Sequence, residues 1–216
     1  MISAIIVAAG KGTRMGPSGD KLFLELAGRP VVAHTWQRFD SAACIDEIVL
    51  VVRDTLQATF TRLAEASQFK KPYRLVIGGK ERQDSVWNGL QALTAATEIV
   101  AIQDGARPCT SEQLIADTIR TARIVGAATA AQPVTDTIKE SDGGTLIART
   151  VDRSTFRVEV IRRALTAVRE KGLVVTDDTA ACELIGQSVG LVESAGSNPK
   201  VTVPADLPYV ELLLRA

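Results

Sequence analysis

Short apolar runs alternate with longer amphipathic stretches along the chain as far as residue 125. The run at 48–52 is apolar without interruption, as is typical of a strand buried on both faces of a parallel sheet. Val86, Leu90 and Leu93 instead recur at helical spacing. Alternation of the two patterns predicts parallel strands joined by right-handed crossover helices.

The predicted fold class is therefore α/β: a Rossmann-like open, mostly parallel twisted sheet with helices on both faces. The pattern predicts strands at 2–8, 48–52, 73–77 and 99–102, the last ending at Asp104, and helices at 31–39, 56–66, 85–93 and 114–125.

The alternation of apolar runs and amphipathic stretches ends after Pro133. Short strands expected at 137–139 and 146–151 flank a Ser-Asp-Gly-Gly turn signal, which predicts a β-hairpin arm at about 136–153. The hairpin is too short and polar to form a core of its own. Beyond it, the pattern predicts a helix at 156–171, a strand at 201–203 and a closing helix at 204–214. Without repeats or linkers, 1–216 is interpreted as one domain with a projecting arm.

Composition narrows the function classes. Lys plus Arg and Asp plus Glu each total 25, so the formal net charge is zero, which disfavours a dedicated nucleic-acid binder. Apolar runs stay well below the roughly 18 residues that span a bilayer, so no membrane partner is expected. The three cysteines, Cys44, Cys109 and Cys182, are widely separated. They are expected to be buried thiols in a protein of the reducing cytoplasm.

A glycine-containing loop directly follows the first predicted strand. Ala8, Ala9, Gly10, Lys11 and Gly12 open it, and such a loop allows close approach of the backbone N–H groups to a ligand. In open α/β sheets, ligands bind at this edge, beyond the carboxyl ends of the strands. The loop is not a P-loop, because no Gly-Lys-Ser/Thr follows at the required spacing.

The cations around this loop point to chemistry at a phosphate. Lys11, Arg14 and Lys21 lie within eleven positions, and a site that breaks a phosphate ester must neutralise charge in the transition state. A nicotinamide oxidoreductase is disfavoured because Met15 occupies the third glycine position of a dinucleotide fingerprint. A turn with solvent-facing cations is the alternative, and the clustering favours a functional site.

Further blocks follow in order along nearly the whole chain. They are Lys21-Leu22-Phe23-Leu24-Glu25-Leu26, Gly78-Gly79-x-x-Arg82-x-x-Ser85-Val86, Asp104-Gly105-Ala106-Arg107-Pro108, Pro133-Val134-x-Asp136-Thr137, Thr150-x-x-Arg153, Thr176-Asp177-Asp178 and Asn198-x-Lys200-Val201-Thr202. Together with the glycine loop they resemble the 2-C-methyl-D-erythritol 4-phosphate cytidylyltransferase family. The opening motif alone indicates only the wider nucleotidyltransferase superfamily, whereas the ordered set is far more specific.

The resemblance implies an isoprenoid-precursor enzyme that transfers CMP from CTP to a phosphorylated polyol and releases pyrophosphate. It implies that Arg14, Lys21 and Lys200 are catalytic and stabilise the α-phosphate, and that Asp104 binds Mg²⁺ or another divalent cation. The nucleotide-binding positions that it implies are Ala8, Ala9, Gly10, Lys11, Gly12, Gly79, Arg82 and Ser85.

On the acceptor side, the resemblance implies binding by Arg107, Thr137, Arg153 and Thr176. A guanidinium can hold a phosphate through two hydrogen bonds, which suits Arg153. The resemblance also implies a homodimer in which the hairpin arm carries Arg153 to the active site of the other subunit. An exposed arginine on a surface hairpin is the alternative.

The chain departs from the family pattern after Arg153. The family carries a stretch with Gln-Thr-Pro-Gln before a Phe, whereas this chain passes directly through Ser154 and Thr155 to Phe156. The stretch contains a threonine expected to bind the acceptor. We expect a loop omitted from the numbering, so that one consecutive pair of Cα atoms between 153 and 156 is separated by well over ~3.8 Å. A true deletion is the alternative and would make weak or altered acceptor turnover plausible.

Two other functions stay open on the sequence. A ribitol 5-phosphate or other polyol phosphate cytidylyltransferase shares most of these motifs, although Thr176, Asp177 and Asp178 favour the methylerythritol acceptor. A nucleotide-binding protein without turnover is suggested only by the missing stretch, and the retained cations argue against it.

Overall fold

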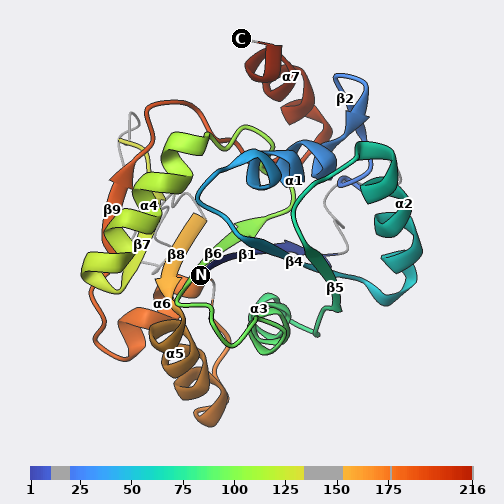
Figure 1. Ribbon diagram of the computed structural model, residues 1–216. Helices are drawn as coiled ribbons and strands as arrows, with labels where there is room; N and C mark the ends of the chain where they lie inside the picture. The colour runs from blue at the N-terminus through green and yellow to red at the C-terminus, as the bar shows by residue number, and fades with distance from the viewer. Residues whose placement is uncertain (11–19, 134–152, 176, 216) are drawn as a thin grey trace, which may run out of the picture.

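A single seven-stranded sheet organises the molecule. The computed structural model describes residues 1–10, 20–133, 153–175 and 177–215 (Figure 1). The strands lie in the order β5-β4-β1-β6-β8-β7-β9, and among them only β8 runs antiparallel to its neighbours. Their bounds are β1 Ile2–Ala8, β4 Glu47–Val52, β5 Tyr73–Ile77, β6 Ile99–Asp104, β7 Ala127–Ala131, β8 Arg153–Arg157 and β9 Gly190–Glu193.

Helices cover both faces of this sheet (Figure 1). Helices α1 (Val31–Ser41), α2 (Gln57–Ser67), α4 (Glu112–Val125) and α7 (Leu207–Arg215) lie on one face, which we call the upper face. Helices α3 (Arg82–Gln91), α5 (Val158–Glu170) and α6 (Asp178–Leu184) lie on the other. The 3₁₀ turns η2 (Asp54–Leu56) and η3 (Pro204–Asp206) precede α2 and α7, and a two-stranded ladder pairs β2 (Glu25–Leu26) with β3 (Arg29–Pro30).

Alternate side chains of the central strands build two separate cores. Ile6 and Leu50 point to the upper core, where Trp36 and Phe39 of α1 are fully buried. Ile5 of β1 joins the lower core formed with α3 and α5. A strand with both faces buried must be apolar at successive positions, which explains the uninterrupted run in β4.

The predicted α/β class and most predicted elements are confirmed. Each strand and helix expected before residue 126 is present, with helix ends shifted by up to three residues. The strand predicted at 201–203 is wrong, because Val201 is buried and donates its N–H to the Ala106 carbonyl outside any strand ladder. The predicted hairpin arm lies outside the described residues. Within the described ranges, no helix combines the length and apolar character needed to cross a membrane.

The prediction of an omitted loop after Arg153 is wrong. Residues Arg153–Arg157 form one continuous strand, paired with β6 from Gln103 to Ile99 without interruption. The same strand pairs with β7 on its other side. Residues 154–156 are therefore needed to complete the sheet, and no space remains in the strand for an omitted stretch. The shortened sequence is a property of this chain, and the helix predicted to start at 156 begins at Val158 instead.

A buried carboxylate joins the amino-terminal ends of the central strands. Glu47 is 4% exposed and accepts hydrogen bonds from the Ser3 hydroxyl at 2.8 Å and from the Thr94 N–H at 3.1 Å. Burial by itself raises the pKa of Glu47, but the bonds from Thr94 and Ser3, together with Arg74, outweigh it and lower the pKa below 4.5.

Replacement of this carboxylate should destabilise the fold in a pH-dependent way. Glu47→Gln should lower the free energy of unfolding at pH 7 by about 1–3 kcal/mol, the cost of leaving buried donors poorly paired. Because the folded-state pKa is depressed, the contribution is present above about pH 4.5 and is lost as the pH falls through the folded pKa. Denaturant unfolding at several pH values should therefore show the deficit shrinking in acid. The exposed Glu65→Gln is the control, and an equal deficit at all pH values would contradict the assignment.

Candidate active site

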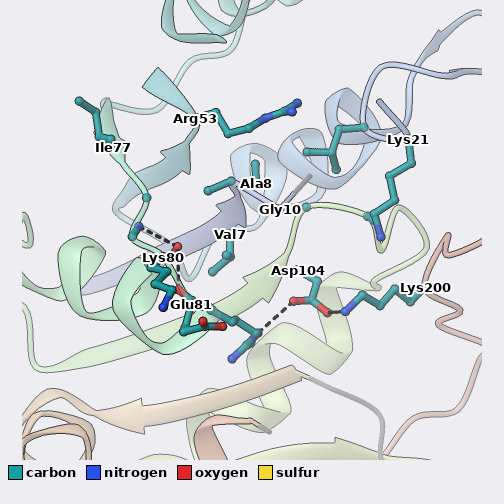
Figure 2. Close-up of a pocket in the computed structure, with 18 of the residues that line it drawn as sticks. Val7, Ala8, Gly10, Lys21, Arg53, Ile77, Lys80, Glu81, Asp104 and Lys200 are labelled. Atoms are coloured by element: carbon teal, nitrogen blue, oxygen red, sulfur yellow. Dashed lines mark hydrogen bonds and ion pairs between the residues drawn. The ribbon is translucent and has the colours of Figure 1, made fainter. Parts of the chain in front are cut away.

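A pocket of about 640 Å³ lies beyond the carboxyl ends of β1, β4, β5 and β6 (Figure 2). This is where an open α/β sheet binds its ligand. The pocket brings together residues from six separate parts of the chain. Its lining includes Ala8, Ala9, Gly10, Lys21, Gly79, Arg82, Ser85, Asp104 and Lys200, all predicted from the sequence to belong to the site.

Apart from Arg107, the remaining predicted site residues are described in part or not at all. Lys11, Gly12, Arg14, Thr137 and Thr176 lie outside the described residues. For Arg153 the structure gives the backbone, which belongs to β8 and pairs with Gln103 of β6. The predicted roles of these residues stay predictions.

One wall of the pocket is built by the turn between β5 and α3. The Gly79 N–H donates to the Ser85 hydroxyl at 3.1 Å, so the turn is held against the first turn of the helix. A Cβ on Gly78 would lie 2.3 Å from the Ala9 side chain, and one on Gly79 would lie 2.3 Å from the Asp84 side chain. Glycines are required here because the turn packs directly against the first loop and α3.

Asp104 lies at the floor of the pocket among three cations. Lys200 Nζ lies 2.6 Å from one carboxylate oxygen, and Arg82 Nε lies 3.5 Å from the other. Arg107 Nε completes the cluster at 3.7 Å. Figure 2 shows the side chains of Lys200 and Asp104 pointing toward one another. Burial raises the pKa of Asp104, but Arg82, Lys200 and Arg107 outweigh it, so its pKa is lowered and the group is ionised at neutral pH.

The carboxy-terminal segment brings two lysines to this floor. Lys21 Nζ donates to the Val201 carbonyl at 3.0 Å, and Val201 is fixed by its N–H bond to the Ala106 carbonyl. Lys200 is the preceding residue, so both ammonium groups meet at one short segment. Their positive charge is concentrated beside the glycine loop, as a polyphosphate site requires.

Arg107 lies behind the pocket floor, beside Asp104. It is 6% exposed, lies outside the pocket lining and donates to the Asn198 carbonyl at 2.8 Å. This bond ties the Asp104 block to the segment that carries Lys200. The structure therefore gives Arg107 a supporting contact, and its contact with an acceptor stays a prediction.

Sequence reasoning missed several residues of the site. Arg53 and Asp54 follow β4 and line the pocket, where Arg53 is ion-paired with Asp20. Lys80 also lines it. Their position directly after the predicted strands at 48–52 and 73–77 was the available signal. Asp178 was noted only as part of a motif, and the structure pairs it with Arg82 at 2.8 Å.

The three cysteines lie outside the lining of this pocket. Cys182 is buried, as predicted, whereas Cys44 and Cys109 are only half-buried. Burial raises the pKa of Cys109 to about 11 and that of Cys182 to about 12. These two thiols are therefore protonated at neutral pH and unsuited to nucleophilic attack.

Asp104 fits a divalent cation as a single protein ligand. Within the described part of the chain, no cluster of three or more His, Cys, Asp or Glu side chains forms a complete metal site. Mg²⁺ usually keeps several waters and is held by one or two carboxylates together with substrate phosphates. The Asp104 carboxylate, on the floor of a pocket of about 640 Å³, meets that requirement.

Comparison with known proteins places the chain in a family. The family model described as 2-C-methyl-D-erythritol 4-phosphate cytidylyltransferase matches residues 2–216. The chain belongs to this family. A cytidylyltransferase of that name from Caldanaerobacter subterraneus subsp. tengcongensis is 39% identical over 224 residues, covering 99% of both chains. One from Bacillus velezensis is 37% identical over 98% of this chain and 95% of its own.

Solved structures of the family share the fold. The 4-diphosphocytidyl-2C-methyl-D-erythritol synthase of Anaerococcus prevotii superposes with a TM-score of 0.87 at 29% identity, covering 100% of this chain and 96% of its own. The 2-C-methyl-D-erythritol 4-phosphate cytidylyltransferase of Thermus thermophilus gives 0.77 at 29% identity over 100% of both chains. The alignment with the Caldanaerobacter cytidylyltransferase is 224 positions long against 216 residues here, in agreement with a shortened segment in this chain.

Proposed function

We propose that this protein transfers CMP from CTP to 2-C-methyl-D-erythritol 4-phosphate in the non-mevalonate route to isoprenoid precursors. An oxygen of the acceptor phosphate attacks the α-phosphorus of CTP, the bond between the α-phosphorus and the bridging oxygen of the β-phosphate breaks, and pyrophosphate leaves. The observation that carries this proposal is the pocket where the glycine loop, Lys21, Asp104 and Lys200 meet. Family membership supports the choice of substrates.

Electrostatics and orientation would supply the catalysis. Several negative groups converge on one phosphorus, so fixed cations lower the barrier more than a proton donor would. Lys21, Lys200 and Arg14 are proposed to stabilise charge on the α-phosphate. The loop from Ala8 to Gly12 would hold the β- and γ-phosphates through backbone N–H groups. Arg82 would also bind the nucleotide. The turn that contains Gly79, together with Ser85, would recognise the cytosine base.

Asp104 is proposed to hold a divalent cation, most simply Mg²⁺. Held by Asp104, the cation would offset the negative charge of the nucleotide phosphates. Lys200 Nζ lies 2.6 Å from one oxygen of Asp104, so its charge would also lie beside phosphates bound at this carboxylate.

The net charge and the cysteine content fit a cytoplasmic enzyme that acts on small molecules. The zero net charge supports a protein without a nucleic-acid partner, and the three separate cysteines support a reducing compartment.

A second acceptor is favoured by one specific observation. The segment that follows Arg153 is shorter than the family pattern, and the missing threonine was expected to bind the acceptor. Ribitol 5-phosphate or another polyol phosphate is therefore the second candidate, with the same nucleotide chemistry.

Pyrophosphate release from CTP tests the proposal directly. The protein is assayed with Mg²⁺ and either methylerythritol phosphate or ribitol 5-phosphate, with ATP, GTP and UTP as nucleotide controls. We expect the highest kcat/KM with CTP and methylerythritol phosphate. A higher value with ribitol 5-phosphate would transfer the assignment to the second candidate. CTP binding without turnover of either acceptor would leave only a nucleotide-binding protein.

We also propose a homodimer in which the 136–153 arm brings Arg153 to the partner subunit's site. Arg153→Ala and Lys21→Ala proteins should each be nearly inactive alone. Their heterodimer would contain one site that retains both residues, so mixing them should restore part of the activity. Heterodimers shown to form by mass spectrometry but lacking activity would refute the shared site.

A further inference from the structure

We propose that Gln83 is a positioning residue that holds the segment 173–175 against α3 and thereby sets the acceptor side of the site. The segment directly precedes position 176 in the sequence. The proposal therefore rests on the proposed function and on the acceptor contact that the family resemblance implies for Thr176. Gln83 lies outside the pocket lining, and none of the roles considered above involves it.

Gln83 makes a two-point contact with the backbone of this segment. Its side-chain amide donates to the Leu173 carbonyl at 2.9 Å, and its side-chain carbonyl accepts the Val175 N–H at 2.9 Å. The amide of one side chain thus replaces a strand partner for two alternate backbone groups. Such paired bonds fix the path of the segment and not only its distance from α3.

The segment has little apolar burial of its own. Leu173 is 42% exposed and Val174 is 73% exposed, while Val175 is partly buried against the lower core. At its start, the Leu173 N–H bonds to the Val168 carbonyl at the end of α5. Within residues 173–175, the side-chain hydrogen bonds that the structure describes are the two made by Gln83.

The neighbouring residue of α3, Arg82, contacts the chain just after position 176. Arg82 lies 2.8 Å from the carboxylate of Asp178, which is 2% exposed, and 3.5 Å from that of Asp104. Residues 82 and 83 therefore bind the chain both before and after Thr176. The first turn of α3 also carries Ser85, which accepts the Gly79 N–H of the nucleotide-side turn.

The first turn of α3 thus connects the nucleotide side of the site with the acceptor side. Each of its residues contacts a different part of the site. Arg82 reaches the pocket floor and Ser85 reaches the nucleotide side, whereas Gln83 contacts only the acceptor-side segment among the interactions described. Loss of Gln83 should therefore weaken the acceptor site and spare the nucleotide site.

Steady-state kinetics of Gln83→Met test this division. Methionine keeps the length of the side chain and removes both hydrogen bonds. We expect KM for methylerythritol phosphate to rise about tenfold, because two net hydrogen bonds no longer favour the competent segment. The KM for CTP and the kcat at saturating acceptor should stay within about twofold of the wild-type values, since groups acting at the α-phosphate are unchanged. Gln83→Glu keeps the acceptor for the Val175 N–H and should give an intermediate acceptor KM.

The matched control is Gln91→Met, the same substitution at an exposed position at the end of the same helix. An unchanged acceptor KM in Gln83→Met would overturn the proposal, and so would an equal rise in the CTP KM. If Gln83→Met does not fold, Gln83→Glu decides by the same criteria. Amide hydrogen exchange supplies a readout without substrate: exchange at residues 173–175 should be faster in Gln83→Met than in Gln91→Met. The wild-type protein could show no turnover while exchange at residues 173–175 is still faster in Gln83→Met than in Gln91→Met. That result would support the positioning role of Gln83 and reject only the proposed reaction.

Discussion

Replacing Lys21 with methionine should lower kcat by roughly 10²–10³, with a much smaller change in KM for CTP. Lys21 Nζ lies at the pocket wall, 3.0 Å from the Val201 carbonyl and close to the segment that carries Lys200. Charge on the α-phosphate grows as the acceptor oxygen approaches. A fixed ammonium group therefore stabilises the transition state more than bound CTP, so kcat takes most of the loss.

Two controls separate this effect from a loss of structure. Lys171→Met removes an exposed lysine after α5 and should leave both kinetic constants unchanged. Thermal unfolding of Lys21→Met should show at most a modest change, because the substitution removes one partly buried hydrogen bond to Val201. Normal turnover by Lys21→Met would mean that the lysine only supports Val201 and does not act on the phosphate.

The central strands could be predicted because burial leaves a mark in the sequence. Strands β1, β4 and β6 are covered on both faces. Both sets of side chains are therefore buried, which produces continuous apolar runs in the sequence. Strands β7, Ala-Ala-Thr-Ala-Ala, and β8, Arg-Ser-Thr-Phe-Arg, carry no such run and were missed. Both depend on partners distant in sequence, since β8 inserts between β6 and β7. A local pattern cannot report a strand that is stabilised mainly by its neighbours.

The same distinction holds for the site. The glycine loop and Asp104 could be placed because each follows a predicted strand at the ligand-binding edge. Lys200 is 96 residues from Asp104 in sequence, and only its resemblance to a family motif suggested a role. The pairing of Arg82 with Asp178 and the contacts of Gln83 with 173–175 join segments about ninety residues apart. Those contacts depend on how α3 packs beside α5, which no local spacing expresses.

Asp104→Asn should produce the largest loss of activity together with a pH-dependent loss of stability. The carboxylate is 5% exposed and faces Arg82, Lys200 and Arg107. An amide of the same shape leaves these cations uncompensated and offers a metal a weaker ligand. We expect kcat to fall by at least about 10³, since both the metal and the arrangement of the lysine are lost.

The stability of Asp104→Asn should depend on pH in a definite direction. Removing one partner of a buried ion pair costs roughly 3 kcal/mol, and the solvent contact of Arg82 and Lys200 keeps the loss near or below that value at pH 7. The folded-state pKa of Asp104 is depressed, so its contribution is present above about pH 3.8 and is lost as the pH falls through the folded pKa. Denaturant unfolding of the two proteins should therefore converge in acid.

Ligand binding provides the decisive signature for Asp104. With the carboxylate gone, the three cations attract the triphosphate without opposition, so metal-free CTP should bind Asp104→Asn at least as tightly as it binds the wild-type protein. The gain in CTP affinity that Mg²⁺ gives the wild-type protein should disappear. Asp54→Asn changes another carboxylate that lines the pocket and should preserve that gain. Calorimetric titration of CTP with and without Mg²⁺ measures both quantities, and an undiminished Mg²⁺ effect in Asp104→Asn would place the metal on another ligand.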